Sequence, residues 1–386
     1  MNTVVVSAKG ATRWRRGHPW IYRSDVLTTA RTPAGPVRVT DRAGRFLGQA
    51  LYSPASEIRL RLLTREEEPL DAAWWRSRVE AAAARRAGLM PETTAYRVVH
   101  AESDGLPSLI VDHYGDIVVA QVLSAGLEAV RPLVLQAIQD LLHPRGVLLR
   151  NDATVRRHEG LPLEIVEVAG SVPAIIEVRE GGIRHLVSPR EGQKTGAFLD
   201  QRENRLLVGR LAQGDALDVF TYQGLFALHA AARCPRVLAV DSSAAALALA
   251  RRNAELNRCG NVEWREANGF DVLRTLEREG ATFGTIVLDP PAFAKQKGAV
   301  PRALAGYKEI NLRAMRLLAP GGVLFTASCS FHVSRAAFLD MLADAAADSG
   351  RRVALECVTG QSSDHPELLT VPETGYLKGA VLRAFA

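Results

Sequence analysis

The C-terminal half of the chain alternates short apolar runs with helical stretches, and this alternation constrains the fold more than any other feature. Strand-like runs are expected at 216–220, 236–240, 262–265, 284–288, 322–327, 353–358 and 380–386. Strands that alternate with helices form a doubly wound, largely parallel α/β sheet. Ligands bind such sheets beyond the carboxyl ends of the strands. The residues that follow each strand should therefore carry the function.

The whole chain has 386 residues, and its pattern suggests three domains. Residues 1–70 have strand-like runs at 3–7, 37–40, 46–52 and 58–63, as in a small β-barrel. An acidic stretch that ends at Pro69 closes this module, and a helix over 71–87 follows. We therefore predict domains at 1–70, 71–180 and 181–386.

The middle region, 71–180, has the pattern of a small α+β domain. Three strands are expected within 94–123, with tight turns at 103–105 and 114–116, and 127–142 has helical spacing. No group of residues there suggests chemistry. We expect this domain to have a structural or substrate-orienting role.

Composition, the N-terminal residues and the cysteine pattern together predict a cytoplasmic protein without a bound metal. The sequence is 47% hydrophobic and 23% charged, and it contains no run of eighteen apolar residues that would span a membrane. Its N-terminus lacks the pattern of an export signal. The four cysteines form no C-x-x-C pair, so neither a disulfide framework nor a zinc site is expected.

The net charge of +6 is concentrated at the N-terminus. Residues 1–70 hold 12 Lys and Arg against 6 Asp and Glu, and the other 36 basic and 36 acidic residues cancel. A local excess of this kind suits a polyanion, and cations interleaved with aromatic residues suit stacking on bases. The residues that we expect to contact RNA in this module are Lys9, Arg13, Arg15, Arg16 and Trp20.

The ends of the first two strands suggest a nucleoside cofactor. The loop 218–224 has neither the G-x-G-x-x-G of a dinucleotide site nor the P-loop pattern of a nucleoside triphosphate site. Asp241 ends the second strand, where a carboxylate can accept both ribose hydroxyls. The alternative for Asp241 is to cap the helix expected at 244–257, although Ser242 or Ser243 could do so instead. A nucleoside without a pyrophosphate favours S-adenosylmethionine (SAM).

The ends of the fourth and fifth strands carry the reactive groups. Asp289 precedes Pro290 and Pro291, which make a rigid turn followed by Phe293, and such a turn can hold a flat base. We expect Pro290 and Phe293 to contact RNA. Cys329 follows the neighbouring strand between two serines, so a thiolate and a carboxylate should face one site.

These two groups fit methylation at C5 of a pyrimidine. That carbon becomes nucleophilic once a thiolate has added to C6. Cys329 would be the nucleophile, and Asp289 would hold or donate a proton at N3. The other three cysteines, Cys234, Cys259 and Cys357, are expected to be small buried hydrophobic residues.

Several motifs together resemble the bacterial 23S ribosomal RNA 5-methylcytosine methyltransferases. They are Lys9 with His18-Pro19-Trp20, Gln193-Lys194-Thr195-Gly196, Phe198-Leu199-Asp200-Gln201-Arg202, Asp289-Pro290-Pro291, Gly306-Tyr307-Lys308, Ser328-Cys329-Ser330, Asp364-His365-Pro366 and Tyr376-Leu377-Lys378-Gly379. The resemblance spans nearly the whole chain. It implies an N-terminal PUA domain, a central α+β domain and a C-terminal class I SAM-dependent methyltransferase domain, with Cys329 as nucleophile.

The resemblance also implies that the strip from Phe198 to Arg202 helps to enclose the cofactor. The full set of residues expected to bind SAM is Phe198, Asp200, Gln201, Arg202, Asp218, Phe220, Tyr222, Gly224, Asp241, Ser242, Asn268, Gly269 and Asp289. Asn268 stands where related enzymes often have an aspartate against the adenine amino group. Ala292 stands where other RNA 5-methylcytosine enzymes have a second cysteine, so the base that removes the C5 proton stays unidentified.

The predicted activity is SAM-dependent formation of 5-methylcytosine in 23S ribosomal RNA, free or in a ribosomal subunit precursor. We expect no membrane and no metal, and a target in a locally open RNA segment. One alternative is a guanine nitrogen methyltransferase, for which Cys329 would be incidental. Another is a non-catalytic RNA-binding assembly factor. The sequence leaves the oligomeric state open, a homodimer included.

Overall fold

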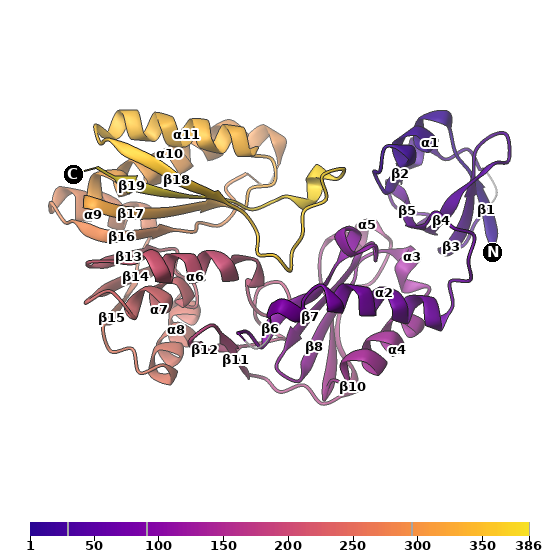
Figure 1. The fold of residues 1–386 in the computed structure, drawn as a ribbon, viewed down its shortest axis with the longest axis horizontal. Coiled ribbons are helices and arrows are strands. Elements are labelled where there is room, and N and C mark those ends of the chain that lie inside the picture. Colours follow the sequence, from indigo (N-terminus) through magenta and orange to yellow (C-terminus); the bar gives the residue numbers. More distant parts are fainter. Residues whose placement is uncertain (29–30, 90–91, 295, 386) are drawn as a thin grey trace. The chain divides into compact units, whose positions relative to one another are not determined.

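The computed structural model describes residues 1–28, 31–89, 92–294 and 296–385, which form two compact units (Figure 1). The first unit consists of Met1–Val178, Val187–Leu199 and Asp364–Thr374. The second consists of Arg179–Leu186, Asp200–Ser363 and Gly375–Ala386. The sequence-based domain boundaries at 70 and 180 stay a prediction.

The first unit begins with a five-stranded sheet in the order β1-β3-β4-β5-β2. Its strands are β1 (Asn2–Val5), β2 (Trp20–Tyr22), β3 (Gly35–Thr40), β4 (Phe46–Tyr52) and β5 (Ile58–Thr64). β1 pairs parallel with β3, and the other pairs are antiparallel. Val4, Ile21 and Leu60 are fully buried in its core. This arrangement agrees with the predicted barrel-like module.

The cation-rich segment between β1 and β2 folds as a helix, α1 (Ala8–Arg15), for which the sequence analysis gave no element. Ser7 caps this helix, because its side chain accepts a hydrogen bond from the amide of Gly10. Trp14 is buried in the core and its indole nitrogen donates to the carbonyl of Pro19 at 3.0 Å. One face of α1 is therefore packed, and its other face carries the cations.

The middle of the first unit is a second five-stranded sheet, ordered β10-β9-β8-β7-β6. Its strands are β6 (Ala95–His100), β7 (Leu109–Tyr114), β8 (Ile117–Val122), β9 (Gly146–Asn151) and β10 (Glu164–Gly170). Helix α2 (Ala72–Ala84) packs against helix α4 (Arg131–Leu142), and α5 (Val155–His158) is a single turn. The three strands expected within 94–123 are confirmed.

The helix expected over 127–142 is interrupted. It consists of α3 (Ala125–Glu128), capped by Ser124, and α4, with Pro132 in the first turn of α4. Proline has no amide hydrogen to bond to the carbonyl of the preceding turn, so it begins a helix more readily than it continues one. The predicted single helix is wrong for this reason.

The segment Asp364–Thr374 returns to the first unit from late in the chain. Asp364 accepts a hydrogen bond from the amide of Arg97 at 2.9 Å, and its carbonyl accepts one from Arg86 at 2.8 Å. Thr370 donates to the carbonyl of Gly17 at 3.0 Å. This segment therefore bonds to the loop after α1 as well as to the central sheet.

The second unit is built on a seven-stranded sheet ordered β15-β14-β13-β16-β17-β19-β18. Its strands are β13 (Ala216–Val219), β14 (Val237–Asp241), β15 (Val262–Glu266), β16 (Phe283–Leu288), β17 (Leu318–Ser328), β18 (Val353–Thr359) and β19 (Lys378–Ala384). The first five are parallel, and β19 runs antiparallel to both of its neighbours. All seven predicted strands are present, although Ala386 lies outside the described residues.

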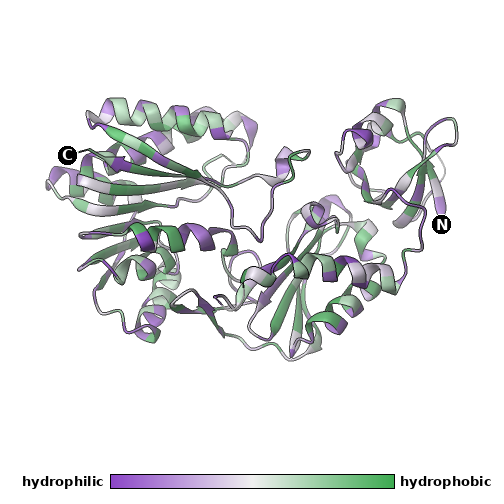
Figure 2. Cartoon of the chain, in the orientation of Figure 1, coloured by the Kyte–Doolittle hydropathy of each residue, from purple (hydrophilic) through white to green (hydrophobic). Residues whose placement is uncertain are grey.

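Helices cover both faces of this sheet: α6 (Arg202–Leu211), α7 (Leu225–Ala231), α8 (Ala244–Leu256), α9 (Gly269–Arg278), α10 (Val300–Leu317) and α11 (Arg335–Ser349). Figure 1 shows α10 and α11 on one side and α6 and α7 on the other. Ile286 and Leu288 pack in one apolar cluster with α10, whereas Val287 packs in another with α6 and α7. Figure 2 shows the corresponding green, hydrophobic strands between the helices. The doubly wound prediction is confirmed.

A short hairpin, β11 (Ile176–Glu180) and β12 (Ile183–Val187), precedes this sheet. Glu180 at its tip is buried and bonds to Arg205 of α6 at 2.6 Å through both carboxylate oxygens. His229 of α7 lies 3.1 Å from the same carboxylate. The hairpin tip is thus fixed to α6 and α7 by a buried ionic group.

The cysteines differ in burial from the sequence-based expectation. Cys234 is buried, but Cys259 is half-buried and Cys357 is exposed. Cys357 lies on β18, which pairs with β19 and is the outermost strand of the sheet among the described residues, and the middle of this strand is mostly exposed. The expectation of a buried residue is therefore wrong for Cys357. In the described part of the chain, no helix has both the length and the apolar surface to cross a membrane.

Candidate functional site

The loop after β13 has an unusual backbone. Phe220, Tyr222 and Gly224 have φ angles of 68°, 51° and 80°, in the left-handed region. For the two aromatic residues this conformation costs roughly 1 to 3 kcal/mol each, and such strain is concentrated at binding sites. A Cβ atom on Gly224 would lie 2.4 Å from the ring of Trp264, so only glycine fits. The loop thus combines three residues in the left-handed region with a close approach to Trp264, which a connection between a strand and a helix does not by itself require.

Asp218, at the base of this loop, is buried and holds the loop from below. Its Oδ2 accepts hydrogen bonds from the Thr221 hydroxyl at 2.5 Å and from the Ala227 amide at 2.9 Å. Its Oδ1 is buried and has no hydrogen-bond partner among the described residues. Burial raises the pKa of Asp218 to about 7, and the nearby carboxylates Asp289 and Asp241 act in the same direction. The sequence-based role of Asp218 as a cofactor ligand stays a prediction.

Asp241 ends β14 beside the same loop. Its two oxygens accept hydrogen bonds from the amides of Tyr222 and Ser243, each at 2.9 Å. Ser243 caps α8 by accepting from Ala246 at 3.2 Å, so the helix cap that was the alternative role for Asp241 is made by serine. Ser242 is exposed next to it. Each carboxylate oxygen of Asp241 has a further lone pair that can accept a hydroxyl.

Asn268 follows β15, on the other side of β14. It is exposed and caps α9, because its side-chain oxygen accepts from the amide of Phe270 at 2.9 Å. A Cβ atom on Gly269 would lie 2.7 Å from Val219 and 2.9 Å from Phe220. The ends of three adjacent strands, β13, β14 and β15, therefore meet closely, as the sequence-based site requires.

Asp289 is oriented by a chain of side-chain amides. Gln201 donates to Asp289 at 2.8 Å and accepts from Asn204 at 2.6 Å, and Asn204 also donates to the carbonyl of Gly360 at 3.0 Å. Gln201 was expected to enclose a cofactor. In the structure it also fixes the carboxylate. Asn204 has no signal in the sequence, because its role depends on contacts between residues far apart in the chain.

Cys329 follows β17 and lies beside the proline turn that follows β16. Its Sγ is 3.9 Å from the carbonyl oxygen of Pro290, and the residue is half-buried. β16 and β17 are adjacent parallel strands. The structure thus brings the thiol and the Asp289 turn to one edge of the sheet, where the sequence placed them.

The serine that follows Cys329 shapes this turn. The Ser330 hydroxyl accepts from the amide of Ala294 at 3.1 Å and lies 2.9 Å from the hydroxyl of Tyr307 on α10. The ring centroids of Tyr307 and Phe293 are 4.5 Å apart, and Phe293 also packs against Phe270 at 5.8 Å. The ring of Phe293 is thus held against two other aromatic rings, and Pro290, earlier in the same turn, is buried.

The strip from 198 to 202 is divided between the two units. Phe198 belongs to the first unit, where the Nζ of Lys194 lies 5.0 Å from its ring. Asp200 and Arg202 belong to the second unit and are buried, and Asp200 accepts a hydrogen bond from the hydroxyl of Tyr376 at 2.7 Å. The predicted contact of this strip with a cofactor stays a prediction.

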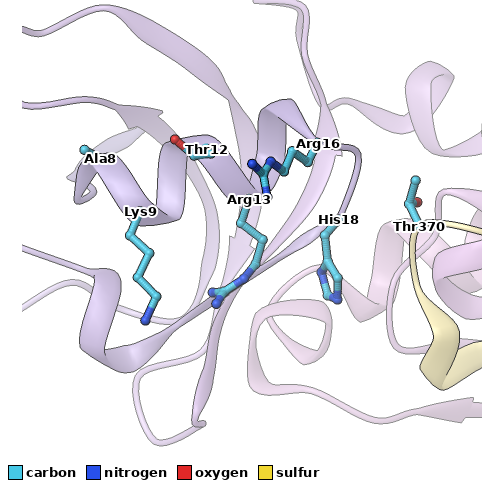
Figure 3. A pocket seen from close by; sticks show the side chains of 7 residues that line it. All are labelled: Ala8, Lys9, Thr12, Arg13, Arg16, His18 and Thr370. Carbon is cyan, nitrogen blue, oxygen red and sulfur yellow. The ribbon is translucent and has the colours of Figure 1, made fainter.

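Three of the four predicted RNA-contacting cations, Lys9, Arg13 and Arg16, lie around a cavity of about 590 Å³ in the first unit (Figure 3), which Ala8, Thr12, His18 and Thr370 also line. Lys9, Arg15 and Arg16 are exposed, and Arg15 bonds to Thr12. Arg13 is half-buried, pairs with Asp25 at 3.0 Å and lies 4.6 Å from the ring of Tyr22.

Two aromatic residues of this face are partly engaged within the protein. The indole nitrogen of Trp20 donates to Glu102 at 2.9 Å, and its ring packs edge-on against His18 at 5.3 Å. Burial lowers the pKa of His18, although Glu373, 3.7 Å away, acts in the opposite direction. The ring of Trp20 is half-buried, so only part of it is available for stacking on a base.

The acceptor groups fit the adenosine part of SAM, because carboxylate and amide oxygens can accept hydrogen bonds from the ribose hydroxyls and the adenine amino group. The oxygens of Asp241 and Asn268 lie at the ends of the adjacent strands β14 and β15, and Asp218 on β13 has a buried oxygen without a hydrogen-bond partner among the described residues. Among the residues that the structure describes, no group of three or more His, Cys, Asp and Glu could hold a metal ion. The adenosine part of a cofactor would bind beside Asp241 and Asn268.

Comparison with known proteins gives matches over both units. Residues 4–65 match the PUA-like domain family, and residues 142–372 match the S-adenosylmethionine-dependent methyltransferase family. The chain is 40% identical over 380 residues to ribosomal RNA large subunit methyltransferase I of Shewanella amazonensis, which covers 96% of each chain. It is 38% identical over 394 residues to the protein of that name from Escherichia coli, which covers 99% of this chain and 100% of the relative.

Two solved structures have the same fold. A Streptococcus mutans protein named as a SAM-dependent methyltransferase has a TM-score of 0.81 and 20% identity, and covers 99% of this chain and 100% of its own. SMU.776, named as a methyltransferase and solved in complex with SAH, has a TM-score of 0.84 and 21% identity with the same coverage.

The fold and the site therefore define a class I methyltransferase with an N-terminal PUA-like domain, and SAM is its cofactor. This confirms the fold class and cofactor that the sequence predicted. The chain belongs to the family of ribosomal RNA large subunit methyltransferase I.

Proposed function

We propose that this protein methylates C5 of a cytosine in 23S ribosomal RNA through a covalent adduct with Cys329. The observation that carries the proposal is the position of the half-buried Cys329 thiol at the end of β17, 3.9 Å from the carbonyl of Pro290 in the turn that follows the adjacent strand β16. The curated relatives are named for methylation of large-subunit ribosomal RNA, which supports the substrate class.

C5 of a pyrimidine is a poor nucleophile by itself, so the reaction needs a protein group that first adds to C6. The Cys329 thiolate forms a bond from Sγ to C6, which places electron density on C5. SAM, when bound, supplies the electrophilic methyl group. Loss of the C5 proton and cleavage of the bond between Sγ and C6 then restore the aromatic ring.

We assign distinct roles to the residues at the strand ends. Asp289, fixed by Gln201, holds or donates a proton at N3 as negative charge develops on the ring. Asp241 accepts the ribose hydroxyls, and Asn268 accepts from the adenine amino group through its second oxygen lone pair. The other predicted contacts with the cofactor are those of Phe198, Asp200, Arg202, Asp218, Phe220, Tyr222, Gly224, Ser242 and Gly269.

We assign RNA binding to α1 and the residue after it, with Lys9, Arg15 and Arg16 as exposed cations, of which Lys9 and Arg16 line the basic cavity. Pro290 and Phe293 would border the target base. We propose domain boundaries near residues 70 and 180, a cytoplasmic location, and either free ribosomal RNA or a subunit precursor as substrate.

RNA that carries 5-fluorocytosine at the target tests the covalent step. Fluorine cannot leave as the C5 proton does, so the wild-type protein should be trapped on this RNA after methyl transfer. Cys329→Ala should lose both trapping and turnover but keep its affinity for SAM. Cys357→Ala, which removes an exposed thiol on β18, is the matched control and should behave as the wild type.

Methylation by Cys329→Ala at near wild-type rate would contradict the covalent mechanism. Together with 1-methylguanine or N2-methylguanine in the product, it would favour the nitrogen methyltransferase, because a ring nitrogen or amine has its own lone pair. Tight binding of SAM without any methylated RNA product would favour the non-catalytic assembly factor.

A further inference from the structure

The side chain of Lys378 is buried next to the proposed nucleophile. Lys378 begins β19 and lies opposite Ser328, the last residue of β17, in the antiparallel ladder. The residue is 3% exposed. Its Nζ donates to the carbonyl of Ser330 at 2.7 Å and to the carbonyl of Tyr376 at 2.9 Å. The amine is therefore tied to the residue that follows Cys329.

This buried amine has no carboxylate partner in the described part of the chain. Its two acceptors are neutral carbonyls, although buried cations are ordinarily paired with an anion. An ammonium group has three donors, and two carbonyls account for two of them. Burial lowers the pKa of Lys378 to about 8, and the charge of Cys329 acts in the opposite direction. A thiolate at Cys329 would thus supply the negative charge that the two carbonyl groups do not give to the Lys378 ammonium.

Other charged and titratable groups face this pair. Arg335, which begins α11, is a like charge that lowers the pKa of Lys378. Tyr307 of α10 is buried, and burial raises its pKa, with Cys329 acting in the same direction. Neither group supplies a negative charge near neutral pH. The Asp289 carboxylate, which precedes Pro290 in the turn beside Cys329, opposes a negative charge on the sulfur, whereas the positive charges of Lys378 and Arg335 favour one.

We infer that Lys378 is a positioning residue that holds Cys329 as a thiolate. This inference rests on the proposed function, in which that thiolate adds to C6. The ammonium stays protonated throughout the cycle, so Lys378 transfers no proton: the thiolate that adds to C6 is the same species that elimination returns. Thiolates beside a lysine form at lower pH than ordinary thiols do.

Alkylation of Cys329 in the full-length protein tests the inference without RNA or SAM. Iodoacetamide labelling, resolved by peptide mass spectrometry, gives the rate at each cysteine as a function of pH. In the wild type, the midpoint for Cys329 should lie below that of the exposed Cys357 in the same sample and also below that of a free cysteine peptide, because burial and Glu356 raise the pKa of Cys357. Equal midpoints, or a higher one for Cys329, would overturn the inference without any variant.

Two substitutions separate the charge from the hydrogen bonds. Lys378→Gln keeps a donor for the carbonyls but removes the charge, so alkylation of Cys329 at pH 7 should fall about tenfold or more. Lys378→Arg keeps the charge and should restore most of the rate. If Lys378→Gln leaves the Cys329 profile unchanged, or if both variants alter it equally, Lys378 has only a structural role and the inference is wrong.

The outcomes for the two proposals differ. If Lys378→Gln raises the alkylation midpoint of Cys329 but Cys329→Ala still methylates RNA, the thiolate inference holds and the proposed mechanism fails. If trapping on 5-fluorocytosine RNA requires Cys329 but Lys378→Gln traps as fast as the wild type at pH 7, the mechanism holds and the inference fails.

Discussion

Replacing Asp218 by asparagine should make the protein more stable at alkaline pH. Asp218 is fully buried, and its carboxylate has one oxygen without a hydrogen-bond partner among the described residues. The asparagine oxygen can accept the hydrogen bonds from Thr221 and Ala227 in place of Oδ2. The variant therefore keeps the bonds that hold the loop and removes a group that must ionise in a buried position.

The magnitude follows from the pKa. Burial raises the pKa of Asp218 from 3.8 to about 7, and this difference corresponds to about 4 kcal/mol between the fully protonated and fully ionised limits. Because the folded-state pKa is the higher one, the folded state binds the proton more tightly. The contribution of this bound proton to the free energy of unfolding is fully present below about pH 4. It decreases progressively as the pH rises from 4 and is lost once the pH has passed through the folded-state pKa of about 7. Between pH 5 and pH 8 the wild type should lose about 2 to 3 kcal/mol relative to the variant.

Denaturant unfolding of both proteins at pH 5 and pH 8 measures this difference, since other titrating groups cancel when the variant is subtracted. The exposed Asp340→Asn on α11 is the control for removing a carboxylate at the surface. If the stability difference between wild type and Asp218→Asn is the same at both pH values, Asp218 has an ordinary pKa and the argument from its burial is wrong.

Three further predictions concern the cofactor loop and the basic face. Asp241→Ala should weaken SAM binding by roughly 1.5 to 3 kcal/mol in calorimetry, and unchanged affinity in the folded variant would remove the ribose role. Gly224→Ala places a Cβ 2.4 Å from Trp264 at a φ of 80° and should destabilise the protein by about 2 kcal/mol in denaturant unfolding; equal stability would mean that the loop adjusts freely. Lys9→Ala with Arg16→Ala should weaken RNA binding and lower the slope of log affinity against log salt by about one for each RNA phosphate that these cations neutralise. An unaltered slope would place the RNA-binding surface elsewhere.

The strands of the second unit could be predicted because each is a short apolar run that alternates with a helix. The same regularity placed Asp241, Asp289 and Cys329 at strand ends, and the structure brings Cys329 to the turn that follows Asp289. Helix α1 was missed because its buried face consists of Gly10, Ala11 and Trp14, which give a weak apolar pattern. The Ser7 cap was the signal that could have located it.

The contacts that orient the site could not be predicted from local pattern. Gln201 and Asp289 are 88 residues apart, and Asp200 and Tyr376 are 176 apart. No period or motif encodes such a pair in one sequence. Lys378 was visible only within a motif of the resemblance, because its role depends on the pairing of β19 with β17.

The return of residues 364–374 to the first unit has a consequence for synthesis on the ribosome. Asp364 accepts from the amide of Arg97, 267 residues earlier, and Thr370 donates to Gly17, 353 residues earlier. During synthesis, the first unit therefore cannot make its contacts with residues 364–374 until nearly all of the second unit has emerged from the ribosome. Contacts so distant in sequence slow folding and leave a long-lived partly folded chain. A single proteolytic cut cannot release the first unit whole, since its three segments are joined through the second.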